Sequence, residues 1–205
     1  MPTIKLYRFP LSGHSHRVEV FLSLLGLDFE LVNLASGVHK QEGFLKKNIF
    51  GQVPVIDDGE ISIADSNAIL IYLATKYDAS KTWLPSNPIH LAEVQRFLSL
   101  AAGKIAFGPA AARAVNVFGA KNDHQKAMNI SHDLLQVLEL HLKDRKWLVS
   151  DSPSIADVAN YTYIAHAPEG DVSLENYPNI QNWLSRFESL SGFVPMISTS
   201  VGLVD

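Results

Sequence analysis

The sequence predicts a small α/β domain followed by an all-helical domain. Residues 1–77 alternate between short β-prone runs and stretches of helical periodicity, which is the pattern of an α/β domain. Residues 78–88 are mostly polar and contain two prolines, so we expect a linker there. Residues 89–205 show helical periodicity only, which predicts a second domain built from helices.

The elements of the first domain are expected in the order strand, helix, strand, short helix, hairpin and helix. Gly26 follows an apolar run at helical spacing and is a typical end for a helix. Asp57-Asp58-Gly59 lies between two β-prone runs and provides the residues that a hairpin turn needs. The expected elements are a strand at 4–7, a helix at 18–25, a strand at 29–34, a short helix at 44–47, a hairpin at 53–64 and a helix at 65–77.

Four helices are expected in the second domain. Ser154 and Asp157 form a variant of the capping box at the start of the third helix, so we assign this pair to folding rather than to chemistry. The expected helices cover residues 89–118, 124–142, 155–165 and 180–190.

The composition excludes several classes of function. The chain has 205 residues and a net charge of −4, and a mildly acidic chain is a poor non-specific binder of nucleic acid. It contains no cysteine, which excludes disulfide scaffolds, cysteine-ligated zinc and a catalytic thiol of its own. His14 and His16 lack a third metal ligand, so we expect no metal site and place both in a solvated loop. No apolar run has the length of a signal peptide or a membrane span, so we expect a cytoplasmic protein with no membrane contact.

Two motifs give the sequence its most specific signal, Gly51-Gln52-Val53-Pro54-Val55-Ile56 and Asp65-Ser66-Asn67-Ala68-Ile69-Leu70. With these motifs at this separation, the chain resembles the soluble glutathione transferases over nearly its whole length. The resemblance implies a thioredoxin-like N-terminal domain, 1–77, and an all-helical C-terminal domain, 89–205. It also implies a cytoplasmic, homodimeric detoxification enzyme that uses glutathione as co-substrate, holds no permanent cofactor and attacks a small, mostly apolar electrophile.

The two motifs are expected to hold glutathione. The resemblance implies a cis bond between Val53 and Pro54, which leaves the backbone of Val53 free to pair with the cysteinyl unit like an added strand. Asp65 and Ser66 begin a helix, where both residue types are favoured caps and where free N–H groups attract an anion. The family places the γ-glutamyl carboxylate at Ser66 and the α-amino group near Asp65.

His39, Lys40 and Gln52 complete the expected glutathione site. Their spacing follows a plant-type pattern of the family, although Gly43 and Ile49 depart from it. Lys40 is expected to pair with the glycine carboxylate and His39 to add a donor. Lys40 can equally be a solvated charge in a loop without a ligand, because an exposed ion pair contributes only about 0–1 kcal/mol.

Ser12 is the expected catalytic donor, with Tyr7 as the alternative. One group of bacterial-like transferases places a serine five residues before the arginine of the first helix, and Ser12 and Arg17 have this spacing. Another group uses a tyrosine at the end of the first strand, where Tyr7 lies. In that group an aromatic residue tends to follow the tyrosine directly, whereas Arg8 follows Tyr7 here. Ser15 is also a candidate cap for the first helix.

The helical domain is expected to form the pocket for the second substrate. The candidate lining residues are Phe9, Leu11, Phe107, Ala111, Arg113 and Val117. Arg113 is notable because a charge within so apolar a stretch indicates a cleft or a dimer groove. Two other functions stay open, a glutathione-dependent disulfide or peroxide reductase at the same site and a binding protein without turnover. An assembly role is disfavoured by the binding residues Val53, Asp65 and Ser66.

Overall fold

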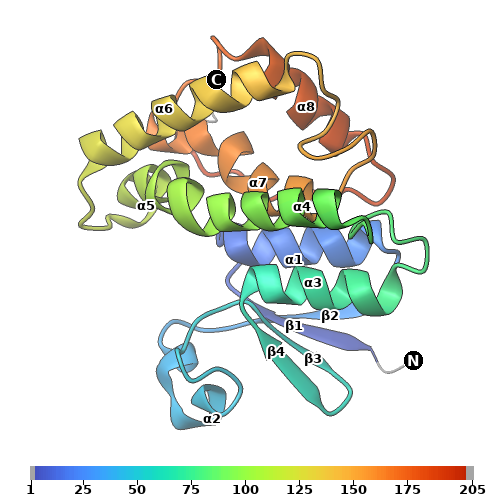
Figure 1. The fold of residues 1–205 in the computed structure, drawn as a ribbon. Helices are drawn as coiled ribbons and strands as arrows, with labels where there is room; N and C mark the ends of the chain where they lie inside the picture. Colours follow the sequence, from blue (N-terminus) through green and yellow to red (C-terminus); the bar gives the residue numbers. More distant parts are fainter. Residues whose placement is uncertain (1–2, 202–205) are drawn as a thin grey trace.

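A four-stranded sheet forms the centre of the N-terminal domain in the computed structural model, which describes residues 3–201 (Figure 1). The strands are β1 (Ile4–Arg8), β2 (Phe29–Asn33), β3 (Val55–Asp58) and β4 (Ile61–Ala64), in the spatial order β2-β1-β3-β4. β1 pairs parallel with β2 through the register Leu6 to Leu31, and antiparallel with β3 through Leu6 to Ile56. β3 and β4 form the expected antiparallel hairpin.

Two helices cover one face of this sheet, α1 (Gly13–Leu24) and α3 (Ser66–Tyr77), and lie between it and the C-terminal helices (Figure 1). A 3-10 turn, η1 (Val38–Lys40), and the short helix α2 (Glu42–Leu45) lie in the long connection between β2 and β3. This mixed sheet with its helices is the thioredoxin-like architecture that the sequence predicted.

The C-terminal domain is entirely helical, as predicted. Its central helix, α7 (Ile155–Ala165), is buried over nearly its whole length and packs against α1, α3 and α4. The capping box is confirmed, and the buried Asp157 carboxylate also accepts hydrogen bonds from Leu148 N–H at 3.0 Å and Trp183 Nε1 at 2.9 Å. The other elements are α4 (Pro88–Leu100), η2 (Ala101–Ile105), α5 (Pro109–Phe118), α6 (His124–Leu142), η3 (Ala167–Gly170) and α8 (Pro178–Glu188).

The expectation of one helix over 89–118 is wrong. Helix α4 passes into a π-helical turn, η2, and α5 starts anew at Pro109. Proline lacks an N–H and its ring clashes with the carbonyl four residues earlier, so it begins a helix well but interrupts one. The backbone of Gly108, at φ −101° and ψ −103°, makes the break.

The expectation that His14 and His16 lie in a solvated loop is also wrong. Helix α1 begins at Gly13, so both histidines belong to its first turn, and His16 is buried. Ser12, not Ser15, is the N-cap of this helix. Among residues 3–201 no cluster of three or more His, Asp or Glu side chains could hold a metal ion. No helix within the same range is long and apolar enough to span a bilayer.

Candidate active site

A cleft of about 720 Å³ opens in the N-terminal domain, next to the beginning of β3 and of α3. Every residue that the sequence analysis assigned to glutathione lines this cleft, although the residues come from three separate segments. The lining residues are Phe9, His14, His39, Lys40, Asn48, Phe50, Gly51, Gln52, Val53, Pro54, Ala64, Asp65 and Ser66. The structure therefore brings the two motifs and the His39-Lys40 pair to one place.

Asn48 shapes the loop that forms the middle of the cleft. Its side-chain nitrogen donates to the carbonyl of Gln52 at 2.9 Å, and its Oδ1 accepts from the N–H of Phe50 at 3.1 Å. Gly51 has φ +54°, and a Cβ there would lie 2.7 Å from the carbonyl oxygen of His39. Only glycine allows the two segments to approach this closely. The peptide bond between Val53 and Pro54 is cis, as predicted.

Asp65 and Ser66 form one end of the cleft at the N-terminus of α3. Asp65 is the N-cap, and its carboxylate accepts from the N–H of Ala68 at 2.9 Å. Its φ of +73° is uncommon for a residue with a side chain, and such conformations concentrate at ligand-binding positions. Ser66 Oγ accepts from Arg17 Nη1 at 2.8 Å. This end of the cleft therefore combines a helix N-terminus with a nearby cation, which is suited to an anion.

Arg17 is a fully buried cation without an ion-pair partner in the described part of the chain. Its Nη1 donates to Ser66 Oγ and to Asn67 Oδ1, whereas Nε and Nη2 have no hydrogen-bond partner. Burial lowers the pKa of Arg17 to about 10, which still leaves the side chain charged at neutral pH. No carboxylate of the described residues therefore pairs with Arg17 at contact distance, although the Asp65 carboxylate acts on its charge from farther away.

His39 and Lys40 lie at another part of the cleft wall. Lys40 is exposed, and its Nζ donates to the carbonyl of Phe50 at 3.3 Å. The ring of His39 packs edge-on against Phe9, with 5.1 Å between the ring centroids. The Nδ1 atom of His39 is buried and has no partner. Both side chains therefore retain hydrogen-bonding capacity in the cleft.

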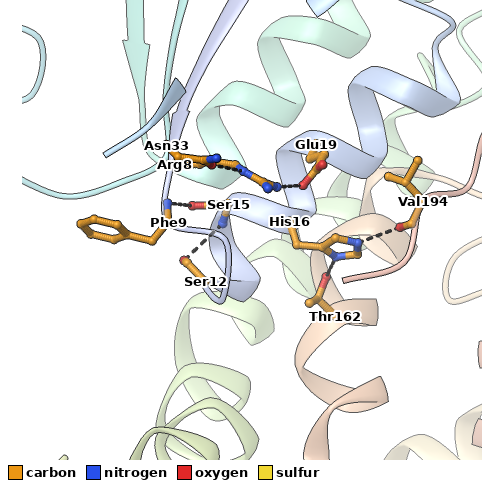
Figure 2. A network of polar contacts seen from close by, with 9 residues as sticks. All are labelled: Arg8, Phe9, Ser12, Ser15, His16, Glu19, Asn33, Thr162 and Val194. Atoms are coloured by element: carbon orange, nitrogen blue, oxygen red, sulfur yellow. Dashed lines mark hydrogen bonds and ion pairs between the residues drawn. The ribbon is translucent and has the colours of Figure 1, made fainter. Parts of the chain in front are cut away.

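Interlocking hydrogen bonds hold the segment before α1 (Figure 2). Ser12 Oγ accepts from the N–H of Ser15 at 3.3 Å, and Ser15 Oγ accepts from the N–H of Phe9 at 3.4 Å. A hydroxyl has one hydrogen to donate and two lone pairs, so accepting from Ser15 leaves the Ser12 hydrogen available. Ser12 lies beside a second cavity rather than within the first cleft.

Tyr7 lies apart from both cavities. Its hydroxyl donates to Asp57 Oδ2 at 2.8 Å, and Lys47 Nζ lies 5.0 Å from the ring centroid. Burial and the Asp57 carboxylate raise the pKa of Tyr7. The hydroxyl hydrogen is therefore already engaged by a carboxylate.

The second cavity, of about 310 Å³, lies between the two domains and shares the wall residue Phe9 with the cleft. Of the predicted second-substrate residues, the structure brings Phe9, Leu11 and Arg113 to it. Phe107 is 67% exposed, and Phe107, Ala111 and Val117 do not line this cavity. The lining residues are Phe9, Leu11, Ser12, Ala110, Arg113, Ala114, Phe118 and Tyr163.

Arg113 is buried, and its charge is paired with a carboxylate. Its Nε pairs with the Glu169 carboxylate and its Nη1 donates to the carbonyl of Leu11 at 2.9 Å. Glu169 also accepts from the N–H of Thr199 at 3.0 Å, and its Oε1 lies 3.1 Å from His166 Nδ1. The cavity beside Ser12 is consequently mostly apolar, with a paired charge in its wall.

The sequence analysis did not assign several lining residues to a cavity. His14 and Phe50 line the cleft, and Tyr163 and Ala114 line the second cavity. Tyr163 comes from the C-terminal domain and packs on Gly13, where an added Cβ would lie 2.7 Å from the tyrosine ring. Only the docking of the two domains brings Tyr163 next to Gly13.

Fold and cavities together define a class of protein, in which a thioredoxin-like domain carries a peptide-sized cleft and a helical domain closes a second cavity. Residues 2–75 match the family described as "Glutathione S-transferase, N-terminal domain", and residues 97–191 match "Glutathione S-transferase, C-terminal domain". Glutathione S-transferase 3 of Zea mays is 34% identical over 175 residues, which cover 80% of this chain and 78% of the maize protein. The chain belongs to the glutathione S-transferase family and is an enzyme of that family.

Solved structures agree with this assignment. The crystal structure of a glutathione S-transferase from Pseudomonas fluorescens matches with a TM-score of 0.89 and 30% identity, over 95% of this chain and 99% of that one. A glutathione transferase homolog from Drosophila mojavensis, solved with bound glutathione, matches with a TM-score of 0.83 and 25% identity, over 93% and 89% of the two chains.

Proposed function

We propose that the enzyme binds glutathione in the cleft and transfers it to a small, mostly apolar electrophile held in the second cavity. The observation that carries the proposal is the position of Ser12 and Phe9. Phe9 lines both cavities, and Ser12 lines the second one from the cap of α1. The Drosophila mojavensis homolog, solved with glutathione, supports the choice of co-substrate.

The polar groups of the cleft match the tripeptide in order. The γ-glutamyl carboxylate binds at the N-terminus of α3 beside Ser66, above Arg17, and the α-amino group lies near Asp65. The cysteinyl backbone pairs with Val53, which lies in the cleft wall. The glycine carboxylate lies toward Lys40, with His39 and Gln52 as further donors.

Ser12 stabilises the glutathione sulfur as a thiolate by donating its hydroxyl hydrogen. A free thiol titrates near 8.5, so about 3% is ionised at pH 7, and lowering its pKa by about two units requires about 2.7 kcal/mol. A hydrogen bond to a charged acceptor is worth about 1.5–3 kcal/mol, and a helix N-terminus adds about 0.3–1 kcal/mol. We prefer Ser12 to Tyr7 because the Tyr7 hydroxyl hydrogen is donated to Asp57.

A difference spectrum of the thiolate, recorded against pH with glutathione bound, tests this function. We expect Ser12→Ala to raise the thiol pKa by about one to two units and to slow turnover, since the donor is lost. Tyr7→Phe should leave that pKa unchanged. The reverse pattern would assign the donor to Tyr7, and absence of glutathione binding to the unaltered enzyme would end the proposal.

We further propose that the enzyme works as a homodimer in the cytoplasm. Phe50 supports a dimer contact, because this large apolar side chain is 73% exposed in the loop before β3. Light scattering tests the assembly by giving either the mass of one chain or twice that mass.

A further inference from the structure

His14 is a cleft residue that neither the binding scheme nor the Ser12 donor uses. Its Nδ1 atom lies 3.5 Å from Ser66 Oγ, at the end of the cleft that is suited to an anion. On another side, the ring packs edge-on against Tyr163, with 5.1 Å between ring centroids and 71° between ring planes. Tyr163 lines the second cavity together with Ser12. His14 thus lies between the carboxylate end of the cleft and the cavity where Ser12 donates.

The surroundings of His14 keep its ring neutral. Burial lowers its pKa to about 4, the nearby Arg17 acts in the same direction, and Asp65 opposes them. A neutral imidazole has one N–H donor and one acceptor nitrogen. Because the Ser66 oxygen already accepts from Arg17 and its hydroxyl hydrogen can be given to Nδ1, we assign the ring hydrogen of His14 to Nε2. That N–H is the group left for a bound ligand.

We propose that His14 donates a hydrogen bond from Nε2 to the sulfur of bound glutathione, as a second donor beside Ser12. The inference rests on the proposed function, because it assigns a further contact within the same site. In the proposed binding mode the cysteinyl unit lies at Val53, between the Ser66 end and Ser12. The sulfur therefore lies in the part of the site that His14 borders.

His14 acts as a donor and not as a base. At neutral pH a ring with so low a pKa does not retain a second proton, so the thiol proton leaves to solvent and the ring keeps its own hydrogen. Donation favours the thiolate over the thiol because an ionised acceptor makes the stronger hydrogen bond. The positive charge that the carboxylate end needs is already supplied by Arg17, which donates to Ser66.

The thiol pKa of bound glutathione, measured by ultraviolet difference spectra, tests the assignment. We expect His14→Ala to raise that pKa by about one unit. At a given pH this corresponds to a roughly tenfold fall in the ratio of thiolate to thiol. His14→Gln should stay close to the unaltered enzyme, because its amide nitrogen reaches the position of Nε2. His14→Asn reaches only the position of Nδ1 and should behave like the alanine variant.

A tripeptide with alanine in place of cysteine separates the sulfur contact from a role in shaping the Ser66 end. Calorimetry should give this analogue the same affinity for His14→Ala as for the unaltered enzyme, within about twofold, which corresponds to about 0.4 kcal/mol. An unchanged thiol pKa in the alanine variant would overturn the inference. So would recovery of the pKa by asparagine instead of glutamine, or loss of affinity for the analogue without a change in the pKa.

Failure of this inference is distinguishable from failure of the proposed function. If the unaltered enzyme binds no glutathione, the proposed function itself is wrong. If it binds glutathione and lowers the thiol pKa, and the His14 variants lower it equally, then only the second donor is wrong.

Discussion

Two arginines, Arg17 and Arg113, are equally buried but have opposite electrostatic surroundings. Each is 1% exposed. Arg113 pairs with the Glu169 carboxylate beside the second cavity, whereas Arg17, beside the cleft, has only neutral partners in Ser66 and Asn67. Burying a charge is costly unless it is paired, so an unpaired one needs a reason.

The difference is consistent with the ligands of the proposed function. The cleft retains positive charge that a carboxylate of the ligand can offset, and the second cavity has its charge offset within the protein. A charged tripeptide and an apolar electrophile fit these two environments. Removing the charge of Arg113 should therefore lower the stability of the fold, whereas removing that of Arg17 should lower the affinity for glutathione.

The largest expected effect is the loss of stability on Arg113→Met. This change leaves the Glu169 charge buried without its partner, and breaking a buried ion pair from one side costs about 3–5 kcal/mol. Urea unfolding measures the free energy of unfolding. The double variant Arg113→Met with Glu169→Gln should recover much of the loss, since no charge is then stranded. Unchanged stability of the single variant would show that the pair contributes little to holding α5 against η3.

A third buried basic residue, His16, differs from both arginines because a histidine can lose its charge near neutral pH. His16 is buried, with Nδ1 2.9 Å from Thr162 Oγ1 and Nε2 2.8 Å from the carbonyl oxygen of Val194 (Figure 2). Burial lowers its pKa to about 4, with smaller effects of His166 and Arg8 in the same direction and of the Val194 carbonyl in the other.

The unfolded chain therefore binds a proton at His16 below about pH 6.5, while the folded protein does not until about pH 4. Stability should fall as the pH drops through this window, by about 1.4 kcal/mol per pH unit from this residue. His16→Gln should reduce the slope by that amount in urea unfolding between pH 6 and pH 4.5. Equal slopes would mean that His16 titrates normally in the folded protein.

The smallest expected effect is on binding, through Arg17→Met. Removing a cation without an ion-pair partner relieves a desolvation cost, so stability should be unchanged or higher. Glutathione affinity should fall about tenfold, or about 1.4 kcal/mol, because the γ-glutamyl carboxylate loses its nearby charge. Calorimetry on both proteins measures this. A variant that loses stability while keeping its affinity would show that Arg17 serves the fold.

The sequence predicted the strands and most helices, and the positions that it assigned to glutathione all line one cleft. Those positions lie in short continuous motifs, so their local spacing largely determines where they meet. Asp65 and Ser66 illustrate this, because the same residue types that cap a helix also present its N-terminus to a ligand. The cis bond before Pro54 was likewise predictable from its motif.

The second cavity was predictable only in part, because it depends on how two domains dock. Phe107 and Ala111 were assigned to it only as residues of the helical domain. Phe107 precedes the break at Gly108 and Pro109, and Ala111 lies on α5 but not among the residues of that helix that line the cavity. His14 and Tyr163 are far apart in the chain and meet only through the packing of α1 against α7. A single sequence carries no local pattern for such a contact.

The two cavities draw their lining from different parts of the chain. Every lining residue of the cleft lies within the first 66 residues, whereas the lining of the second cavity also includes Ala110, Arg113, Ala114, Phe118 and Tyr163. Under the proposed function, glutathione is therefore recognised by one domain and the electrophile by both. Exchanging α5 is a route to new electrophiles that leaves the tripeptide's own binding surface untouched.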